Sequence, residues 1–298
     1  MPSRTRRLVT SLVATALVAT LGLVVAPSAT AATKPSIYAD TPAYAISTST
    51  VRFSGTVFPA SGQKVRVQRK SGTTWVSIDT ATVSASTGKF SVAYRVPAGK
   101  KSYRLVVSKT ARTSAAAKTW STWTTDGTKY KAYIARARSY MKAYCPRTPI
   151  FIGDDLVNSY TVGMATERYS ATSYGGSSER HFTWQHQIHL EPGLSKPLLR
   201  HVALHECAHI VQFRRLVKGP EARAKAEKTT ATVFKRRAGE YGDGNERQAD
   251  CMAIVITNKK QYGGYTQSCT GARATSAKAL WKAYGKKYQA PVYSFTVK

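Results

Sequence analysis

The residues best suited to chemistry lie in one short run, His205-Glu206-Cys207-Ala208-His209, which has the form H-E-x-x-H. Histidines four positions apart project from the same face of a helix, so both imidazoles can bind one metal ion. A glutamate between them can polarise a water held at an open position on that metal. The pattern is therefore typical of a zinc hydrolase with Glu206 as the general base.

The surrounding residues predict that this motif lies on a helix. Pro197 suits a first helical turn, and apolar residues recur after it at helical spacing. They are Leu198, Val202, Leu204, Ala208, Ile210 and Val211. His201 precedes His205 by four residues and shares its face, and we interpret it as a packed helix histidine that could border the metal. A helix holds both imidazoles in the geometry that metal binding requires.

A second motif lies downstream, where Glu246 and Asp250 are again four residues apart on an expected helix. The two motifs together resemble the gluzincin group of zinc metallopeptidases, in which E-x-x-x-D follows H-E-x-x-H on a later helix. The run Glu-Arg-Gln-Ala-Asp-Cys is also similar to the matching segment of bacterial neutral zinc metallopeptidases. The resemblance implies that His205, His209 and Glu246 bind Zn²⁺. It also implies that Asp250 hydrogen-bonds His205 and fixes its tautomer.

Other residues compete for these roles. Glu240 and Asp243 are rival third ligands, but their glycine-rich surroundings predict a loop, which positions a ligand less firmly than a helix. The plainer interpretation of Glu246 and Asp250 is a solvated acidic helix face. The chain has only 15 acidic residues against 45 basic ones, so two carboxylates on one short helix favour the ligand interpretation. The candidates for an oxyanion donor flank that helix and are Tyr241, Tyr262 and Tyr265.

The start of the chain is typical of a secretory signal peptide over residues 1–31. A cationic beginning is followed by an apolar run over residues 8–26 and by the cleavage signal Ala29-Thr30-Ala31. The alternative is a membrane anchor, because the apolar run is almost long enough to span a bilayer. The small residues after the run favour cleavage. We therefore expect a secreted protein, extracellular or associated with the cell wall, and without a membrane partner.

The chain has four cysteines, which in an oxidising compartment predict two disulfides with three connectivities. A pair between Cys251 and Cys269 would close a short loop and brace the helix that carries Glu246. Cys145 and Cys207 would then form the second pair. Cys207 lies about 200° around the helix from His205, so we expect it to face away from the metal.

Residues 36–124 predict a small all-β domain. The expected strands alternate apolar and polar residues and are residues 50–57, 63–69, 74–78, 90–94 and 102–107. Turn signals at Ser61-Gly62, Ser71-Gly72 and Thr87-Gly88 separate them, and this spacing predicts a β-sandwich. The pattern V-x-V-Q-R-x-S-G-x-x-W over residues 65–75 resembles bacterial immunoglobulin-like modules. Residues 115–126 are interpreted as the linker that follows.

Residues 126–298 predict a mainly helical domain that carries both motifs. The expected fold class is two domains, an all-β immunoglobulin-like sandwich followed by a mainly α (α+β) zincin-like metallopeptidase domain. Short strands are expected at Phe151-Ile152 and at 185–190, just before the metal helix. In gluzincins the strand before that helix pairs with the substrate backbone. By that resemblance, residues 184–190 line the cleft.

Charge adds a constraint on partners. The formal net charge of +30 becomes +27 once the three arginines of the signal peptide are removed, and the charge is spread over both domains. A secreted protein of this kind is expected to meet anionic cell-wall polymers and not a specific nucleic acid. The plainer interpretation is solubility alone.

These observations predict a secreted zinc-dependent metallopeptidase that hydrolyses peptide bonds in a peptide or protein substrate with a zinc-activated water. One alternative is a non-catalytic wall-binding or adhesion protein with a vestigial metal site. Another is a zinc amidase acting on peptidoglycan peptides with the same residues. The zinc content of the purified protein distinguishes the binder from the two enzymes.

Overall fold

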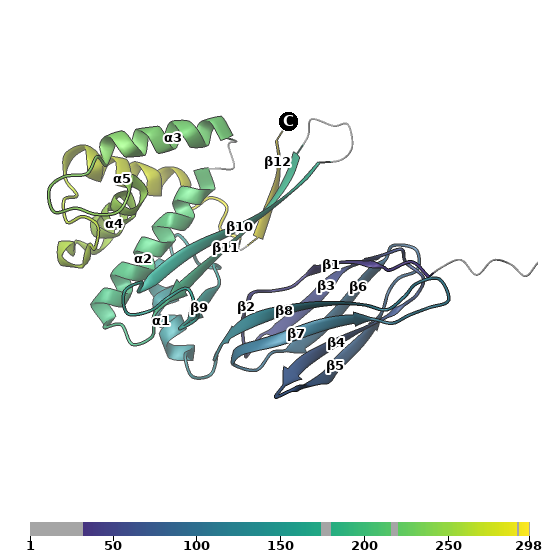
Figure 1. Ribbon diagram of the computed structural model, residues 1–298. Coiled ribbons are helices and arrows are strands. Elements are labelled where there is room, and N and C mark those ends of the chain that lie inside the picture. The colour runs from purple at the N-terminus through teal and green to yellow at the C-terminus, as the bar shows by residue number, and fades with distance from the viewer. Residues whose placement is uncertain (1–31, 174–179, 216–219, 291, 298) are drawn as a thin grey trace, which may run out of the picture.

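The structure is a computed structural model that describes residues 32–173, 180–215, 220–290 and 292–297 (Figure 1). The expected signal peptide, residues 1–31, lies outside the described residues. Within the described ranges, no helix combines the length and the apolar character needed to cross a bilayer.

The first region of the chain consists of two sheets that share a core. Its strands are β1 Ser36–Asp40, β2 Tyr44–Ile46, β3 Thr50–Phe58, β4 Lys64–Ser71, β5 Thr74–Thr82, β6 Lys89–Arg95, β7 Gly99–Val107 and β8 Ala116–Thr125. The strand orders are β1-β3-β6 and β2-β8-β7-β4-β5. Alternate side chains point inward, so Phe53 of the first sheet meets Tyr103 and Trp120 of the second at ring distances of 5.6 and 5.3 Å.

The second region combines a sheet with helices that pack against it. Its elements are α1 Lys131–Met141, β9 Ile150–Ile152, β10 Gly163–Ser173, β11 Arg180–Leu190, α2 Lys196–Phe213, α3 Pro220–Val233, α4 Gly244–Thr257, the 3₁₀ turn η2 Lys260–Tyr262, α5 Gly271–Tyr284 and β12 Val292–Val297. The strand order is β10-β11-β12, and β9 pairs in parallel with β11. Helix α2 lies between β10 and the helices α4 and α5, as Figure 1 shows.

The expected fold class is wrong. The chain is not an all-β immunoglobulin-like sandwich followed by a mainly α zincin-like domain, but a mixed α/β structure with about 31% helix and 33% strand across three sheets. The expected linker at 115–126 contains strand β8, which lies between β2 and β7. Strands β10 and β11 are eleven residues each and pair along their whole length. Their many polar residues hide the apolar alternation by which a strand is recognised.

The two regions contact each other directly. The backbone N–H of Ile152 on β9 donates to the Thr125 hydroxyl at the end of β8, at 2.8 Å. The carboxylate of Asp155, just after β9, accepts from Tyr44 of β2 and from Lys100 of β7, both at 3.2 Å. These contacts hold the first region against the segment that leads from β9 to β10.

All four cysteines form disulfides, with the connectivity named from the sequence. Cys145 pairs with Cys207 of α2 at a Cα–Cα distance of 6.0 Å, and Cys251 of α4 pairs with Cys269 at 5.1 Å. Each bridge therefore fixes one helix of the second region to a segment distant in sequence. Bridges of this kind stabilise small domains by about 2–4 kcal/mol.

Candidate metal centre

Helix α2 places the two motif histidines side by side. It has Pro197 in its first turn, as expected, and its residues from Val202 to Ala208 are buried. His205 and His209 are one turn apart, and their Nε2 atoms lie 3.0 Å from each other. Both imidazoles are almost fully buried, with side chains 8% and 12% exposed. The predicted pair therefore converges on a single point.

Helix α4 brings Glu246 to the same point. The helix begins after Asp243, whose carboxylate accepts hydrogen bonds from the backbone N–H groups of Asn245 and Glu246. Because of this cap, Glu246 lies in the first helical turn with its Oε2 atom 3.1 Å from the Nε2 atoms of both His205 and His209. Asp243, one of the rival ligands, is occupied by its capping role.

Gln212 determines which nitrogen of His209 carries a proton. The Nε2 amide of Gln212 donates to the Asn245 carbonyl and to Oε1 of Gln248, at 2.9 and 3.1 Å. The Gln212 oxygen must then accept, and it lies 2.8 Å from Nδ1 of His209. The Nδ1 atom of His209 is therefore the donor, and its Nε2 atom presents a lone pair.

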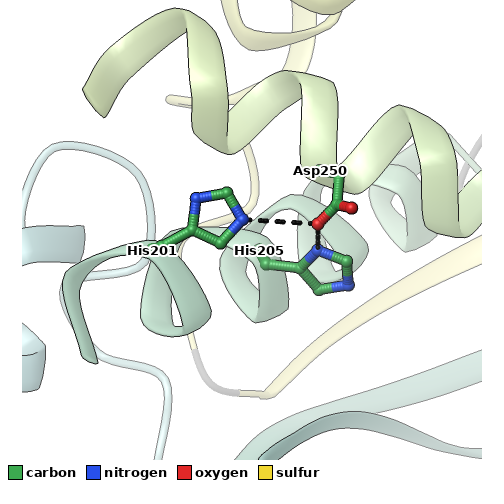
Figure 2. Close-up of side chains that lie close together, drawn as sticks. All are labelled: His201, His205 and Asp250. Atoms are coloured by element: carbon green, nitrogen blue, oxygen red, sulfur yellow. Dashed lines mark hydrogen bonds and ion pairs between the residues drawn. The ribbon is translucent and has the colours of Figure 1, made fainter. Parts of the chain in front are cut away.

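Asp250 has the same effect on His205, as Figure 2 shows. Its Oδ1 atom accepts from Nδ1 of His205 at 2.8 Å and from Nε2 of His201 at 3.3 Å. Its Oδ2 atom accepts from the backbone N–H groups of Tyr265 and Thr266. With four donors around it the carboxylate stays ionised, so His205 keeps its proton on Nδ1 and turns a lone pair toward Glu246.

With both histidines neutral, three acceptors thus meet at one point, and this arrangement fits a metal cation. The Nε2 atoms of His205 and His209 and the Oε2 atom of Glu246 are 3.0–3.1 Å apart. Ligands about 2.0–2.1 Å from a tetrahedral zinc ion lie roughly 3.3 Å from one another. Nitrogen, nitrogen and carboxylate oxygen are a donor set that zinc accepts. These three residues are a group that could hold a metal ion.

The charges at the centre favour a cation there. Burial acts to raise the pKa of Glu246, but the hydrogen bonds of His205 and His209 outweigh it and hold that pKa well below its usual range. Burial likewise acts to lower the pKa of His205, and hydrogen bonds with Asp250 and Glu246 outweigh it and raise the pKa to about 10. Without a metal ion, His205 therefore holds a second proton and donates it from Nε2 to Glu246. A cation that binds the three converging atoms takes the place of that proton.

His201, His205 and Asp250 form a second group that could hold a metal ion. It shares His205 and Asp250 with the arrangement above, where these two residues are already hydrogen-bonded to each other. The Nδ1 atom of His201 is buried and has no hydrogen-bond partner among the described residues. His201 is thus a buried partner of Asp250, which agrees with its interpretation as a packed histidine beside the centre.

Glu206 lies on the other side of the centre, against strand β10. Its side chain is buried, and burial raises its pKa although a backbone hydrogen bond from Ala165 acts in the opposite direction. The strand can approach this closely because residue 163 is glycine. A Cβ atom at Gly163 would lie 2.6 Å from the Oε1 atom of Glu206. A buried carboxyl with a raised pKa, beside residues that could hold a metal ion, is suited to accept and donate a proton.

The centre opens into a cleft of about 730 Å³. One wall is the start of β10, from Gly163 to Ala165, with residues 160–162 before it. The expectation that residues 184–190 line the cleft is therefore wrong, because that segment belongs to β11, which β10 separates from the cleft as the edge strand. Tyr262 and Tyr265 line the cleft, whereas Tyr241 does not.

Glu240, the remaining rival ligand, is bound elsewhere. Its buried carboxylate accepts hydrogen bonds from the Arg273 guanidinium, the Thr266 hydroxyl and the Arg237 backbone N–H group. The Arg273 hydrogen bond is the largest of the effects that lower the Glu240 pKa to about 2. Thr266 also donates its backbone N–H to Asp250. Glu240 thus supports the loop that holds Asp250 in place.

Gln212 is the functional residue that sequence reasoning missed. Its signal was weak but present, since it follows His209 by three residues and shares its helix face. No known family model matches the chain, and a search of curated proteins finds no match. The interpretation of the centre therefore rests on its own geometry.

Proposed function

We propose that this protein is a zinc-dependent metallopeptidase with a gluzincin-like ligand set. The observation that carries the proposal is the convergence of three lone-pair donors, from His205, His209 and Glu246, with Glu206 beside them in an open cleft. The side chain of Glu246 is 32% exposed, so the centre is reachable from the cleft. A structural zinc site has four protein ligands, whereas three ligands and an accessible side are typical of a catalytic site.

Bound zinc would supply Lewis acidity, which acidifies water and polarises the carbonyl of a peptide bond. His205 and His209 would hold the zinc through Nε2, because Asp250 and Gln212 keep a proton on each Nδ1. Glu206 accepts the proton of the attacking water as the water oxygen bonds to the carbonyl carbon. It then donates that proton to the amide nitrogen as the C–N bond breaks. The raised pKa of Glu206 suits both transfers.

Strand β10 supports a peptide substrate. It is the edge of its sheet in the described residues, and its first three residues line the cleft beside Glu206. The free edge of a strand pairs with an extended peptide through backbone hydrogen bonds. A peptide bound along Gly163 to Ala165 would pass directly in front of the general base. Aromatic residues such as Phe213 and Tyr265 line the cleft beside the polar residues of the centre.

The first test separates metal binding from hydrolysis. Glu206→Gln should retain one zinc per chain and lose peptide hydrolysis, because the amide cannot accept the proton of water. Glu246→Ala should lose zinc and activity together. Glu221→Gln, on the exposed start of α3 and outside the cleft, is the matched control and should change neither.

The substrates are an unfolded protein and peptidoglycan stem peptides, so that an amidase acting through the same residues is also detected. Zinc is measured by elemental analysis on each purified variant. Full hydrolysis by Glu206→Gln, or wild-type zinc content in Glu246→Ala, would overturn the proposal.

A further inference from the structure

The outer face of the five-stranded sheet is a second surface with a distinct chemistry (Figure 1). Residues directly opposite each other in antiparallel register share a face. Val65 and Val67 of β4 lie opposite Val107 and Leu105, and all four are buried in the core. The residues between them, such as Arg66, therefore point outward.

This outer face carries a series of cations, which we call the basic face. They are Lys64, Arg66 and Lys70 on β4 and Lys100 and Arg104 on β7. Alternate residues of a strand are about 7 Å apart, and neighbouring strands are about 4.8 Å apart. The cations thus form two adjacent rows on a rigid sheet. The three of β4 are exposed to solvent.

The basic face has almost no compensating carboxylate. The five strands contain a single acidic residue, Asp79, which is exposed on β5 where the register of the β4–β5 pair shifts. Its carboxylate accepts a hydrogen bond from the Thr80 backbone N–H. Asp155 outside the sheet contacts Lys100 alone among these cations. By comparison, the outer face of β1-β3-β6 has three cations, Arg52, Lys89 and Arg95, and also the carboxylate Asp40.

The neutral groups on the basic face favour ionic recognition. The ring of Trp75 is covered by the Arg104 guanidinium at 4.5 Å, and Arg104 is held in place by a hydrogen bond to Gln68. The Trp75 ring is therefore not free to stack on a nucleobase. The residues directly opposite the other cations are Thr80 and Thr82 on β5, Val106 on β7 and Trp123 on β8. Such a surface suits a flexible chain of phosphates joined by hydroxyl-bearing units.

We propose that the basic face binds a linear polyol-phosphate polymer, the chemical class of the phosphodiester polymers of cell walls. Binding rests on charge complementarity, because each phosphate meets a cation of the two rows and releases its own counterions. The serine and threonine hydroxyls of β5, beside the β4 row, meet the polyol units. This function is separate from the metal centre and does not depend on hydrolysis.

The test measures binding of the full chain to purified poly(glycerol phosphate) by titration calorimetry at several salt concentrations. The triple variant Lys64→Gln, Arg66→Gln, Lys70→Gln should lose at least about tenfold in affinity. The slope of log K against log salt should fall by about two, since three phosphate contacts are removed. Thermal melting confirms that the variant is folded.

The matched control removes the same charge from the other sheet of the same region. The variant Arg52→Gln, Lys89→Gln, Arg95→Gln should bind within about twofold of wild type. An equal loss in both variants would show a nonspecific effect of net charge and would overturn the proposal. Wild-type affinity in the β4 variant would overturn it as well.

Two further probes test the choice of partner. Single-stranded DNA of equal charge and anionic phospholipid vesicles should bind more weakly than the polymer, and tighter binding of either would reassign the face. The variant Glu206→Gln should bind the polymer like wild type. A failure of the proposed peptidase activity would therefore leave this result unaffected.

Discussion

The two regions of the molecule differ in what they bury. In the first region the buried polar side chains among the described residues are uncharged, and they are Gln63, Gln68, Thr113, Thr122, Thr124 and Thr125. In the second region the buried residues include Asp154, His186, His189, His201, His205, Glu206, Arg214, Glu240, Arg247, Asp250 and Arg273. Burying ionisable groups is costly unless each is paired. The first region is thus stabilised by apolar packing. The second region also buries ionisable groups, around the candidate metal centre and around Glu240.

The buried charges of the second region fall into two clusters with different purposes. At the candidate metal centre, His205, His209 and Glu246 face one another and could hold a cation. Around Glu240 and Arg273 the charges neutralise each other through direct hydrogen bonds. The second cluster holds Thr266, which in turn donates to Asp250. The cluster around Glu240 thus helps to hold Asp250 of the candidate metal centre in position.

The largest effect is expected from Arg273→Met, which leaves the buried Glu240 carboxylate without its closest cation and with only Arg247 at 3.8 Å. Breaking a buried pair in this way costs about 3–5 kcal/mol. The control is Arg104→Met in the first region, where the guanidinium rests on Trp75 at the surface and is worth about 1 kcal/mol or less. Chemical denaturation measures both. Equal losses in the free energy of unfolding would contradict the view that only the second region depends on buried ion pairs.

Acid should weaken the second region through Glu240. Its folded-state pKa is about 2, because the Arg273 hydrogen bond and further hydrogen bonds lower it from a usual value near 4.5. The stabilisation of the folded state by the ionised Glu240 carboxylate is present above pH 4.5. It amounts to about 3 kcal/mol and is lost as the pH falls toward 2. Denaturation of wild type and Glu240→Gln between pH 6 and 2 checks this. A difference between the two proteins that stays constant with pH would contradict it.

A smaller effect, on metal affinity, is expected from Asp250→Asn. The substitution weakens the hydrogen bond that keeps the His205 proton on Nδ1. Loss of such a partner lowers metal affinity by about 10–100-fold. Asp154→Asn is the matched control, because Asp154 contacts Nδ1 of His189 at 2.6 Å in the same manner but away from the centre. Zinc competition with a chelator should detect a change in the first variant only.

The smallest effect on stability is expected from the exposed ion pair that joins the two regions. Lys100→Ala removes the ion pair with Asp155, whose two side chains are 56% and 45% exposed. Exposed pairs contribute about 0–1 kcal/mol, so the thermal unfolding midpoint should hardly move. A loss of several degrees would show instead that the two regions unfold as one cooperative unit.

The grouping of His205, His209 and Glu246 was predictable from the sequence, and the fold was not. The spacing within H-E-x-x-H and E-x-x-x-D is local, so a helix alone brings each pair together. Whether Glu240 or Asp243 is available as the third metal ligand depends on hydrogen-bond partners. The partner of Glu240, Arg273, is distant in sequence. The order of strands is also nonlocal, which is why β11 was expected to line the cleft in place of β10. Strand β8 was interpreted as a linker for the same reason.

The segment between β9 and β10 contacts both the first region and the cleft. Its Asp155 is bound to Tyr44 and Lys100 of the first region, and its end, residues 160–162, forms a wall of the cleft. Lys100 also belongs to the basic face, so a bound phosphate and Asp155 compete for one ammonium group. A phosphate that binds Lys100 would therefore replace one of the contacts that join the first region to this segment.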